Sequence, residues 1–257
     1  MKKILLSVLL AASIVIPSLS QSDTNGTERF DKNVLKVNLT GLLFSNYSFQ
    51  YERMLSRKIS LALSVRTQPK GPIPATGFVE GLIDDPETFA ELERLRLGNF
   101  ALTPEVRFYL GKKSGPRGFY VAPFMRYSKF QIEVADFEYV VTETVNGQDI
   151  TETRTLNLNG DIKGITGGLM FGSQWRLGRS VYLDWWIIGG SFGSSSGMIT
   201  VNTPLNVEEQ DAIRQELNSL EIPLLDYTVE VSGTGAKMNF QGPFASLRGG
   251  LSLGIKF

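Results

Sequence analysis

Apolar side chains recur at every second position in eight segments of the chain, with polar or small residues between them. A period of two is typical of a β-strand whose two faces meet different surroundings. In the segment 59–67, for example, Leu61, Leu63 and Val65 alternate with alanine, serine and arginine. The eight predicted strands are 34–44, 47–55, 59–67, 99–110, 118–130, 162–177, 180–192 and 243–257.

The connections between these strands alternate between short and long. Connections two, four and six are the short segments 56–58, 111–117 and 178–179. Connections three, five and seven are the long segments 68–98, 131–161 and 193–242, and only the first, Ser45-Asn46, departs from the pattern. Outer-membrane barrels have short periplasmic turns and long extracellular loops. The sequence therefore predicts an all-β protein, an eight-stranded antiparallel up-and-down transmembrane β-barrel over 34–257, with both ends on the periplasmic side.

Charge follows the same division of the chain. The three long connections hold 20 acidic and 6 basic residues, whereas the short turns contain basic residues and no acid. Every carboxylate within a predicted strand lies on the polar face, as expected if the other face contacts lipid, where charge is destabilising. The one exception on the apolar face is Arg53, which lies beside a turn, where a long side chain can reach the lipid headgroups.

The polar face of the strands predicts a charged interior. An eight-stranded barrel is just wide enough for its side chains to fill it. Opposite charges confined there should pair, because an unpaired buried charge is costly. We therefore expect a network of ion pairs that plugs the lumen. Its predicted members are Glu52, Arg66, Glu105, Arg107, Arg126, Asp184 and Arg248.

A narrow path for ions or small solutes is the alternative reading of the same interior. Glycines at 164, 167, 168 and 172 thin the wall in the sixth strand and keep this alternative open. Glycine within a strand also marks tight curvature. A planar-bilayer conductance measurement would separate a small porin-like channel from a plugged structural or interaction barrel.

The first 20 residues have the pattern of a secretion signal. Lys2 and Lys3 precede an apolar run from Ile4 to Ile16, and Ser18 and Ser20 supply the small residues of a cleavage site. The run is shorter than the roughly 20 apolar residues of a membrane-spanning helix. We expect residues 1–20 to be a cleaved signal peptide, residues 21–33 a periplasmic tail, and the outer membrane to be the destination.

The long connections also contain structural signals. A helix is predicted from 85–87, and a second helix is capped by Asn206 with Glu209 three residues later. Asn146-Gly147 is a hairpin turn, which suggests that strands five and six project beyond the membrane. These elements are interpreted either as a folded cover on the barrel mouth or as a recognition surface. The acidic loops could meet an extracellular partner or divalent cations.

Much enzyme chemistry is excluded by composition. The chain has no cysteine and no histidine, so Ser-His-Asp triads, Cys-His pairs and histidine-ligated metals cannot form. Barrel-shaped membrane enzymes generally depend on histidine or on acids clustered at the rim, and the strand acids here lie toward the periplasmic half. We expect no enzyme activity and no cofactor. The net charge of zero does not favour nucleic acid as a partner.

Four strand segments carry a family resemblance. The sequences at 36–40, 50–53, 103–109 and 118–123 resemble the small outer-membrane β-barrels common in Bacteroidota, which are OmpA/OmpX-like eight-stranded barrels and include a family of unknown function. The resemblance covers the strands, about half of the mature chain, and hardly touches the long loops. It implies the barrel and its location but no activity. Phe257 resembles the terminal aromatic residue that barrel-assembly machinery reads.

A water-soluble ligand carrier such as a lipocalin also has eight strands. Such a carrier has an apolar interior and a polar exterior, the reverse of the predicted arrangement. The membrane interpretation therefore depends on the burial of the two faces. It would fail if Leu39, Leu63, Val121 and Leu253 lay inside while Glu105 and Arg107 faced solvent.

Overall fold

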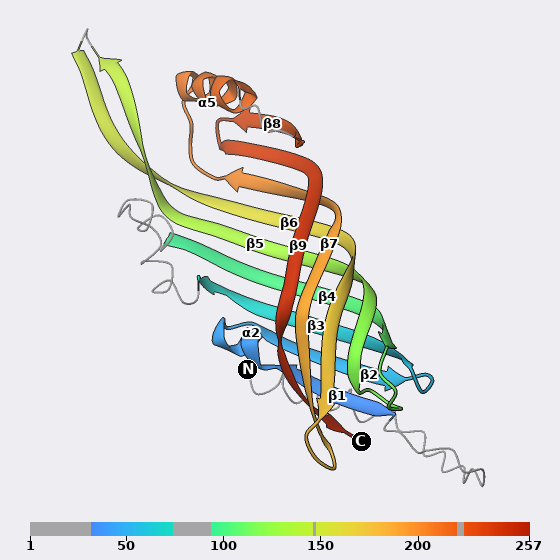
Figure 1. Ribbon diagram of the computed structural model, residues 1–257. Helices are drawn as coiled ribbons and strands as arrows, with labels where there is room; N and C mark the ends of the chain where they lie inside the picture. The colour runs from blue at the N-terminus through green and yellow to red at the C-terminus, as the bar shows by residue number, and fades with distance from the viewer. Residues whose placement is uncertain (1–31, 74–93, 146–147, 220–223) are drawn as a thin grey trace.

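One antiparallel sheet dominates the computed structural model, which describes residues 32–73, 94–145, 148–219 and 224–257. The strands lie side by side in chain order, except that β8 is at the end of the sheet beyond β9 (Figure 1). Their bounds are β1 Asn33–Asn38, β2 Tyr47–Met54, β3 Ile59–Pro72, β4 Leu95–Tyr109, β5 Gly118–Val145, β6 Gln148–Arg176, β7 Val181–Val201, β8 Asp226–Ser232 and β9 Gly235–Lys256.

The sheet closes on itself through the first strand and the last. β1 pairs with β2 on one side and with β9 on the other, where Val37 lies opposite Leu253. The backbone N–H of Phe257 donates to the carbonyl oxygen of Asn33 at 3.2 Å. Eight strands, β1 to β7 and β9, therefore form a ring, and β1 has no free edge along this pairing.

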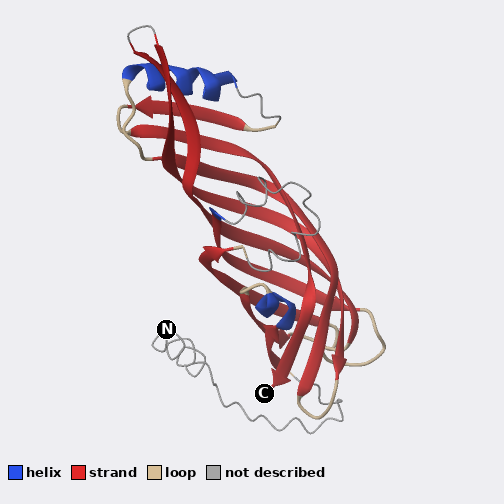
Figure 2. Ribbon diagram, turned by 90° about the vertical axis from the view of Figure 1, so that its left-hand side faces the viewer, coloured by secondary structure: helices blue, strands red, loops and turns tan. Residues whose placement is uncertain are grey.

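The strands that form the ring are short on one side and long on the other. β1 and β2 have 6 and 8 residues, whereas β5 and β6 have 28 and 29. The long strands continue past the ring as a curved sheet, and β8 and the helix α5, Val207–Ser219, lie at its far end (Figures 1 and 2). We call this part the extension. The ring end that carries the turns 55–58, 110–117 and 177–180 is the turn end, and the opposite end is the loop end.

The first predicted strand, 34–44, is wrong beyond Asn38. Residues Leu39–Leu43 form a short helix, α2, and the Asn38 side chain caps it by accepting a hydrogen bond from the Gly41 N–H at 2.6 Å. The local cause is visible in the sequence, because three consecutive apolar residues at 42–44 do not alternate as a strand would. The other seven predicted strands all lie in the ring.

Two of the long connections contain more strand than their predicted bounds allow, in line with the suggested projection of strands five and six. β5 and β6 pair with each other up to Val145 and Gln148, so most of 131–161 is strand rather than loop. The segment 193–242 likewise contains the ends of β7 and β9 together with β8 and α5. The predicted turn at 146–147 and the predicted helix start at 85–87 lie outside the described residues.

The predicted cap of the second loop helix is confirmed. The Asn206 side chain accepts from the Glu209 N–H, and the Glu209 carboxylate accepts from the Asn206 N–H, both at 2.8 Å. This reciprocal pair satisfies two backbone donors at the start of α5. Neither α5 nor any other helix in the described part of the chain has the length and apolar character needed to cross a membrane.

Candidate functional site

The two faces of the ring differ in the way that the alternation predicts. On the outer face, Leu63 and Leu253 are 44% and 39% exposed, and on the inner face Ser64 and Glu105 are 4% and 2% exposed. Leu39 also faces outward, at 39%, while Val121 is half-buried. The apolar side chains therefore lie outside and the charged side chains lie inside, which is the reverse of a soluble carrier.

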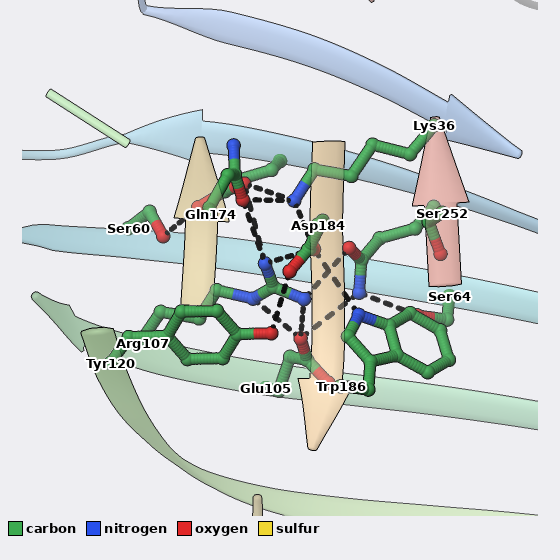
Figure 3. A network of polar contacts seen from close by, with 12 residues as sticks. Lys36, Ser60, Ser64, Glu105, Arg107, Tyr120, Gln174, Asp184, Trp186 and Ser252 are labelled. Carbon is green, nitrogen blue, oxygen red and sulfur yellow. Dashed lines mark hydrogen bonds and ion pairs between the residues drawn. The ribbon is translucent and has the colours of Figure 1, made fainter. Parts of the chain in front are cut away.

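Arg107 lies at the centre of the charged interior (Figure 3). Its side chain is fully buried, and its guanidinium contacts two carboxylates closely, Glu105 Oε1 at 2.6 Å and Asp184 Oδ2 at 2.7 Å. It also donates to Gln50 Oε1 at 2.8 Å. The guanidinium carbon lies 4.4 Å from the ring centre of Tyr120, a cation–π geometry. Arg107 thus joins residues from β2, β4, β5 and β7.

Lys36 is the second buried cation of the network, and sequence reasoning missed it. The Lys36 Nζ lies 2.6 Å from Glu52 Oε2 and 2.7 Å from Asp184 Oδ2, and it donates to Gln174 Oε1 at 2.6 Å. Its side chain is 1% exposed. The signal was present, because Lys36 lies on the polar face of the first predicted strand. The same signal marks Gln50 and Gln174.

Neutral donors complete the surroundings of the buried carboxylates. Tyr109 and Ser60 donate to Glu52 Oε1 at 2.6 and 2.5 Å. Tyr120 donates to Asp184 Oδ1 at 2.8 Å, and the indole N–H of Trp186 lies 3.1 Å from Asp184 Oδ2. Glu52 and Asp184 therefore have hydrogen bonds in addition to their ion pairs, and these offset part of the cost of burying a charge.

Arg248 brings a third cation to the network. Its guanidinium lies 3.2 Å from Glu105 Oε2, and its guanidinium carbon lies 4.6 Å from the ring centre of Phe124 and 4.9 Å from that of Trp186. Three cations, Lys36, Arg107 and Arg248, therefore balance three carboxylates. We call these six residues and their hydrogen-bond partners the charge network. The six charged residues come from five of the eight strands in the ring, and their hydrogen-bond partners add the other three. The network fills the interior of the ring toward the turn end.

Two of the seven predicted network residues lie apart from it. Arg66 donates to Asn99 Oδ1 at 2.7 and 3.0 Å, and Arg126 donates to Ser128 Oγ at 3.3 Å. Neither forms an ion pair with a carboxylate of the described residues. The structure thus brings together five predicted residues, adds Lys36, and places Arg66 and Arg126 nearer the loop end.

Gly172, one of the four glycines noted in the sixth strand, does not leave an open gap beside the charge network. A Cβ added at Gly172 would lie 2.3 Å from the Tyr120 ring, so the aromatic side chain already occupies that space. Tyr120 in turn is 1% exposed and holds Asp184 through its hydroxyl. At this position the absence of a side chain makes room for a member of the network.

Ion pairs at the loop end and on the extension are of a different kind. Lys129 and Asp161 lie 3.2 Å apart but are 40% and 50% exposed. Lys70 and Glu133 also pair, and the hydrogen bond from Lys70 lowers the pKa of the Glu133 carboxyl below its ordinary value. Exposed pairs of this type contribute little to stability because water screens them. The buried charge network is the site that distinguishes this fold.

The expected binding of divalent cations at the acidic loops has no preformed site in the part of the chain that the structure describes. No group of three or more side chains there could hold a metal ion. The acidic residues between 74 and 93 lie outside the described residues.

The comparisons with known proteins give no family for this chain. A scan against family models and searches of curated proteins and of solved structures find no match.

Proposed function

We propose that this chain is a non-enzymatic outer-membrane β-barrel whose interior is closed by the charge network and whose extension presents a surface to partners outside the cell. The observation that carries the proposal is the inverted ring, in which exposed apolar side chains surround buried charge. A water-soluble ring would gain nothing from this arrangement, since its apolar surface would face water.

The dimensions of the ring support insertion in a bilayer. β2 has 8 residues, and the part of β3 within the ring, from Ile59 to Gln68, is of similar length. A tilted strand needs about 9–11 residues to cross a bilayer. Aromatic pairs lie on the outer face toward the turn end, Tyr51 with Phe257 and Trp175 with Trp185, as in the aromatic girdles of outer-membrane barrels.

The distribution of the connections supports the orientation. The turn end carries basic turns and the backbone contact between Asn33 and Phe257, whereas the acidic residues of α5 and β8 lie in the extension. The proposed signal peptide at 1–20 would deliver the chain to the periplasm, where the turn end remains. The loop end and extension would then face the outside.

The charge network supports a plugged interior rather than a passage. Arg107 and Asp184 are both fully buried and lie 2.7 Å apart near the axis of the ring. A solute could pass only by separating these charges, which is costly in a poorly hydrated interior. Because of this cost, a small porin-like channel is only the second candidate. The observation that favours it is the cavity at the loop end described below.

The experiment combines location and conductance. We expect the refolded protein to show heat-modifiable gel mobility, and protease added to intact cells to cut within 193–242 while the ring survives. In planar bilayers the wild type is expected to be silent, and the Arg107→Ala variant is expected to conduct. Discrete channels formed by the wild type would support the porin-like alternative. A protein that is recovered in the water-soluble fraction, and whose gel mobility does not change on heating, would contradict the barrel proposal.

A further inference from the structure

A cavity of about 250 Å³ lies inside the ring at its loop end, on the α2 side of the charge network. β1 to β5, β7 and β9 contribute to its walls, and α2 and the residues after it contribute Thr40, Gly41, Phe44 and Asn46. Its charged lining consists of three arginines, Arg66, Arg126 and Arg248, and includes no carboxylate. A cavity with this lining is strongly electropositive.

The three arginines have fewer partners than their burial demands. A guanidinium has five N–H donors, and Arg126, which is 6% exposed, donates only to Ser128 within the described residues. Arg66 donates to a neutral amide, and Arg248 shares the carboxylate of Glu105, which also pairs with Arg107. The three cations also repel one another, since Arg126 feels the charges of both Arg66 and Arg248.

The charge balance of the interior indicates the charge of an anion that would suit the cavity. Lys36, Arg107 and Arg248 are matched by Glu52, Glu105 and Asp184. Arg66 and Arg126 are left over, so the described interior carries two uncompensated positive charges. A single dianion in the cavity would neutralise both, whereas chloride or a monocarboxylate would neutralise one.

We propose that this cavity is a binding site for a dianionic oxyanion of the phosphate or sulfate class. Guanidinium groups match the tetrahedral oxyanion with paired, charge-assisted hydrogen bonds. Ser48 and Thr103 also line the cavity, are 6% and 3% exposed, and have hydroxyl groups that can donate to the remaining oxygens. The site goes beyond the plugged-barrel proposal. Its cavity and charges are independent of that proposal, whereas the source of the anion rests on it.

The anion comes from solution rather than from the bilayer. Ser48, Ser64, Thr103 and Arg126 all belong to the inner face of the strands. A lipid headgroup on the outer wall would have to cross the sheet to reach them. An oxyanion dissolved outside the cell needs only to enter at the loop end.

Calorimetry with inorganic phosphate tests the site in the full chain, refolded in an uncharged detergent at low salt. We expect one phosphate per chain and a dissociation constant on the order of tenfold weaker, or more, in both Arg126→Gln and Arg66→Gln, since each loses charge-assisted hydrogen bonds. The matched control is Arg53→Gln, which removes the same charge from the exposed outer face and should leave the affinity unchanged.

Thermal melts separate a binding residue from a structural one. Without phosphate, Arg126→Gln should melt at the wild-type temperature or above, because it relieves repulsion. With phosphate, only the wild type and Arg53→Gln should gain stability. Equal phosphate binding by wild type and Arg126→Gln, absence of binding at millimolar phosphate, or a lower melting temperature for phosphate-free Arg126→Gln would each overturn the proposal.

A second arm distinguishes the source of the oxyanion. The protein is reconstituted in phosphatidylcholine vesicles with and without phosphatidic acid and then titrated with phosphate. We expect the same affinity in both. If phosphatidic acid weakens phosphate binding by the wild type, a lipid headgroup competes for the cavity, and the assignment to a dissolved anion is wrong.

Discussion

At the scale of single residues, Asp184 connects two buried cations of the charge network, Lys36 and Arg107. Its Oδ2 accepts from Lys36 and from Arg107, both at 2.7 Å, and its Oδ1 accepts from Tyr120. The three partners are contributed by β1, β4 and β5. Removing the charge of this carboxylate leaves two buried cations with less compensation, and such a loss is more costly than the intact ion pair is stabilising.

We therefore expect Asp184→Asn to destabilise the ring by about 3–5 kcal/mol. The measurement is reversible urea unfolding of the protein folded in vesicles, followed by tryptophan fluorescence. Asp161→Asn is the matched control, because it removes an exposed partner of Lys129 and should cost less than about 1 kcal/mol. If the two variants lose similar amounts of unfolding free energy, the buried charge network does not stabilise the ring more than an exposed ion pair does.

Gly172 offers a second test at this scale. Because a Cβ there would meet the Tyr120 ring at 2.3 Å and a backbone oxygen at 2.8 Å, Gly172→Ala should push Tyr120 away from Asp184. Overpacking of this kind costs about 1–3 kcal/mol. Gly178→Ala is the control, since a Cβ at Gly178 meets nothing within 4 Å. The measurement is the urea midpoint of unfolding for both variants. Equal midpoints would show that the close contact between Gly172 and Tyr120 does not affect stability.

At the scale of elements, the alternation of side chains predicts the strands because each face of the ring has one kind of surroundings. It fails where the backbone leaves the regular pleat. In β7 the register with both neighbours shifts around Ile187, so Trp186 is buried while Ile187 and Ile188 are both exposed. A bulge adds one residue without changing composition, so the period alone cannot locate it.

The partners within the charge network were less predictable than the strands. The sequence placed Glu52, Glu105 and Asp184 on the inner face, but not opposite particular cations. Lys36 and Asp184 are 148 residues apart and meet only because the ring closes between β1 and β9. Register and closure decide these contacts, and both depend on the whole sheet rather than on any one segment.

The tip of the β5–β6 hairpin is an element that the ring does not need. Pairing of β5 with β4 ends at Val134, and pairing of β6 with β7 begins at Leu158, which is the partner of Val134. Beyond this pair the two strands pair with no other strand of the described sheet. We call residues 135–157 the hairpin tip.

Replacing the hairpin tip with Asn-Gly should therefore leave the stability of the ring unchanged, because a two-residue turn can join Val134 directly to Leu158. Urea unfolding of the shortened protein in vesicles is the measurement. If the full-length protein binds whole cells or matrix components, and if the extension is the interaction surface, the shortened protein should lose this binding. A large fall in the unfolding midpoint would mean that the tip supports the ring after all.

At the scale of the whole molecule, the inverted ring and the asymmetric charge point to the same surroundings. The outer wall is apolar between the two ends, the turns are basic, and the acidic residues of α5 and β8 lie beyond the loop end. α2 extends the apolar wall, with Leu42 and Leu43 44% and 77% exposed. In water this surface would favour association between molecules, whereas in a bilayer it is satisfied by acyl chains.

Charge placed on the outer wall distinguishes these two surroundings. Leu63 lies midway along the ring part of β3, and Met198 lies on the extension in β7; they are 44% and 37% exposed. In a water-soluble protein, arginine at either position would change stability by about 0.5 kcal/mol or less. In a membrane barrel, Leu63→Arg should cost about 2–4 kcal/mol because its guanidinium enters hydrocarbon, while Met198→Arg remains harmless. Folding into phosphatidylcholine vesicles measures both, and an equally small effect of the two substitutions would argue against a bilayer around this ring.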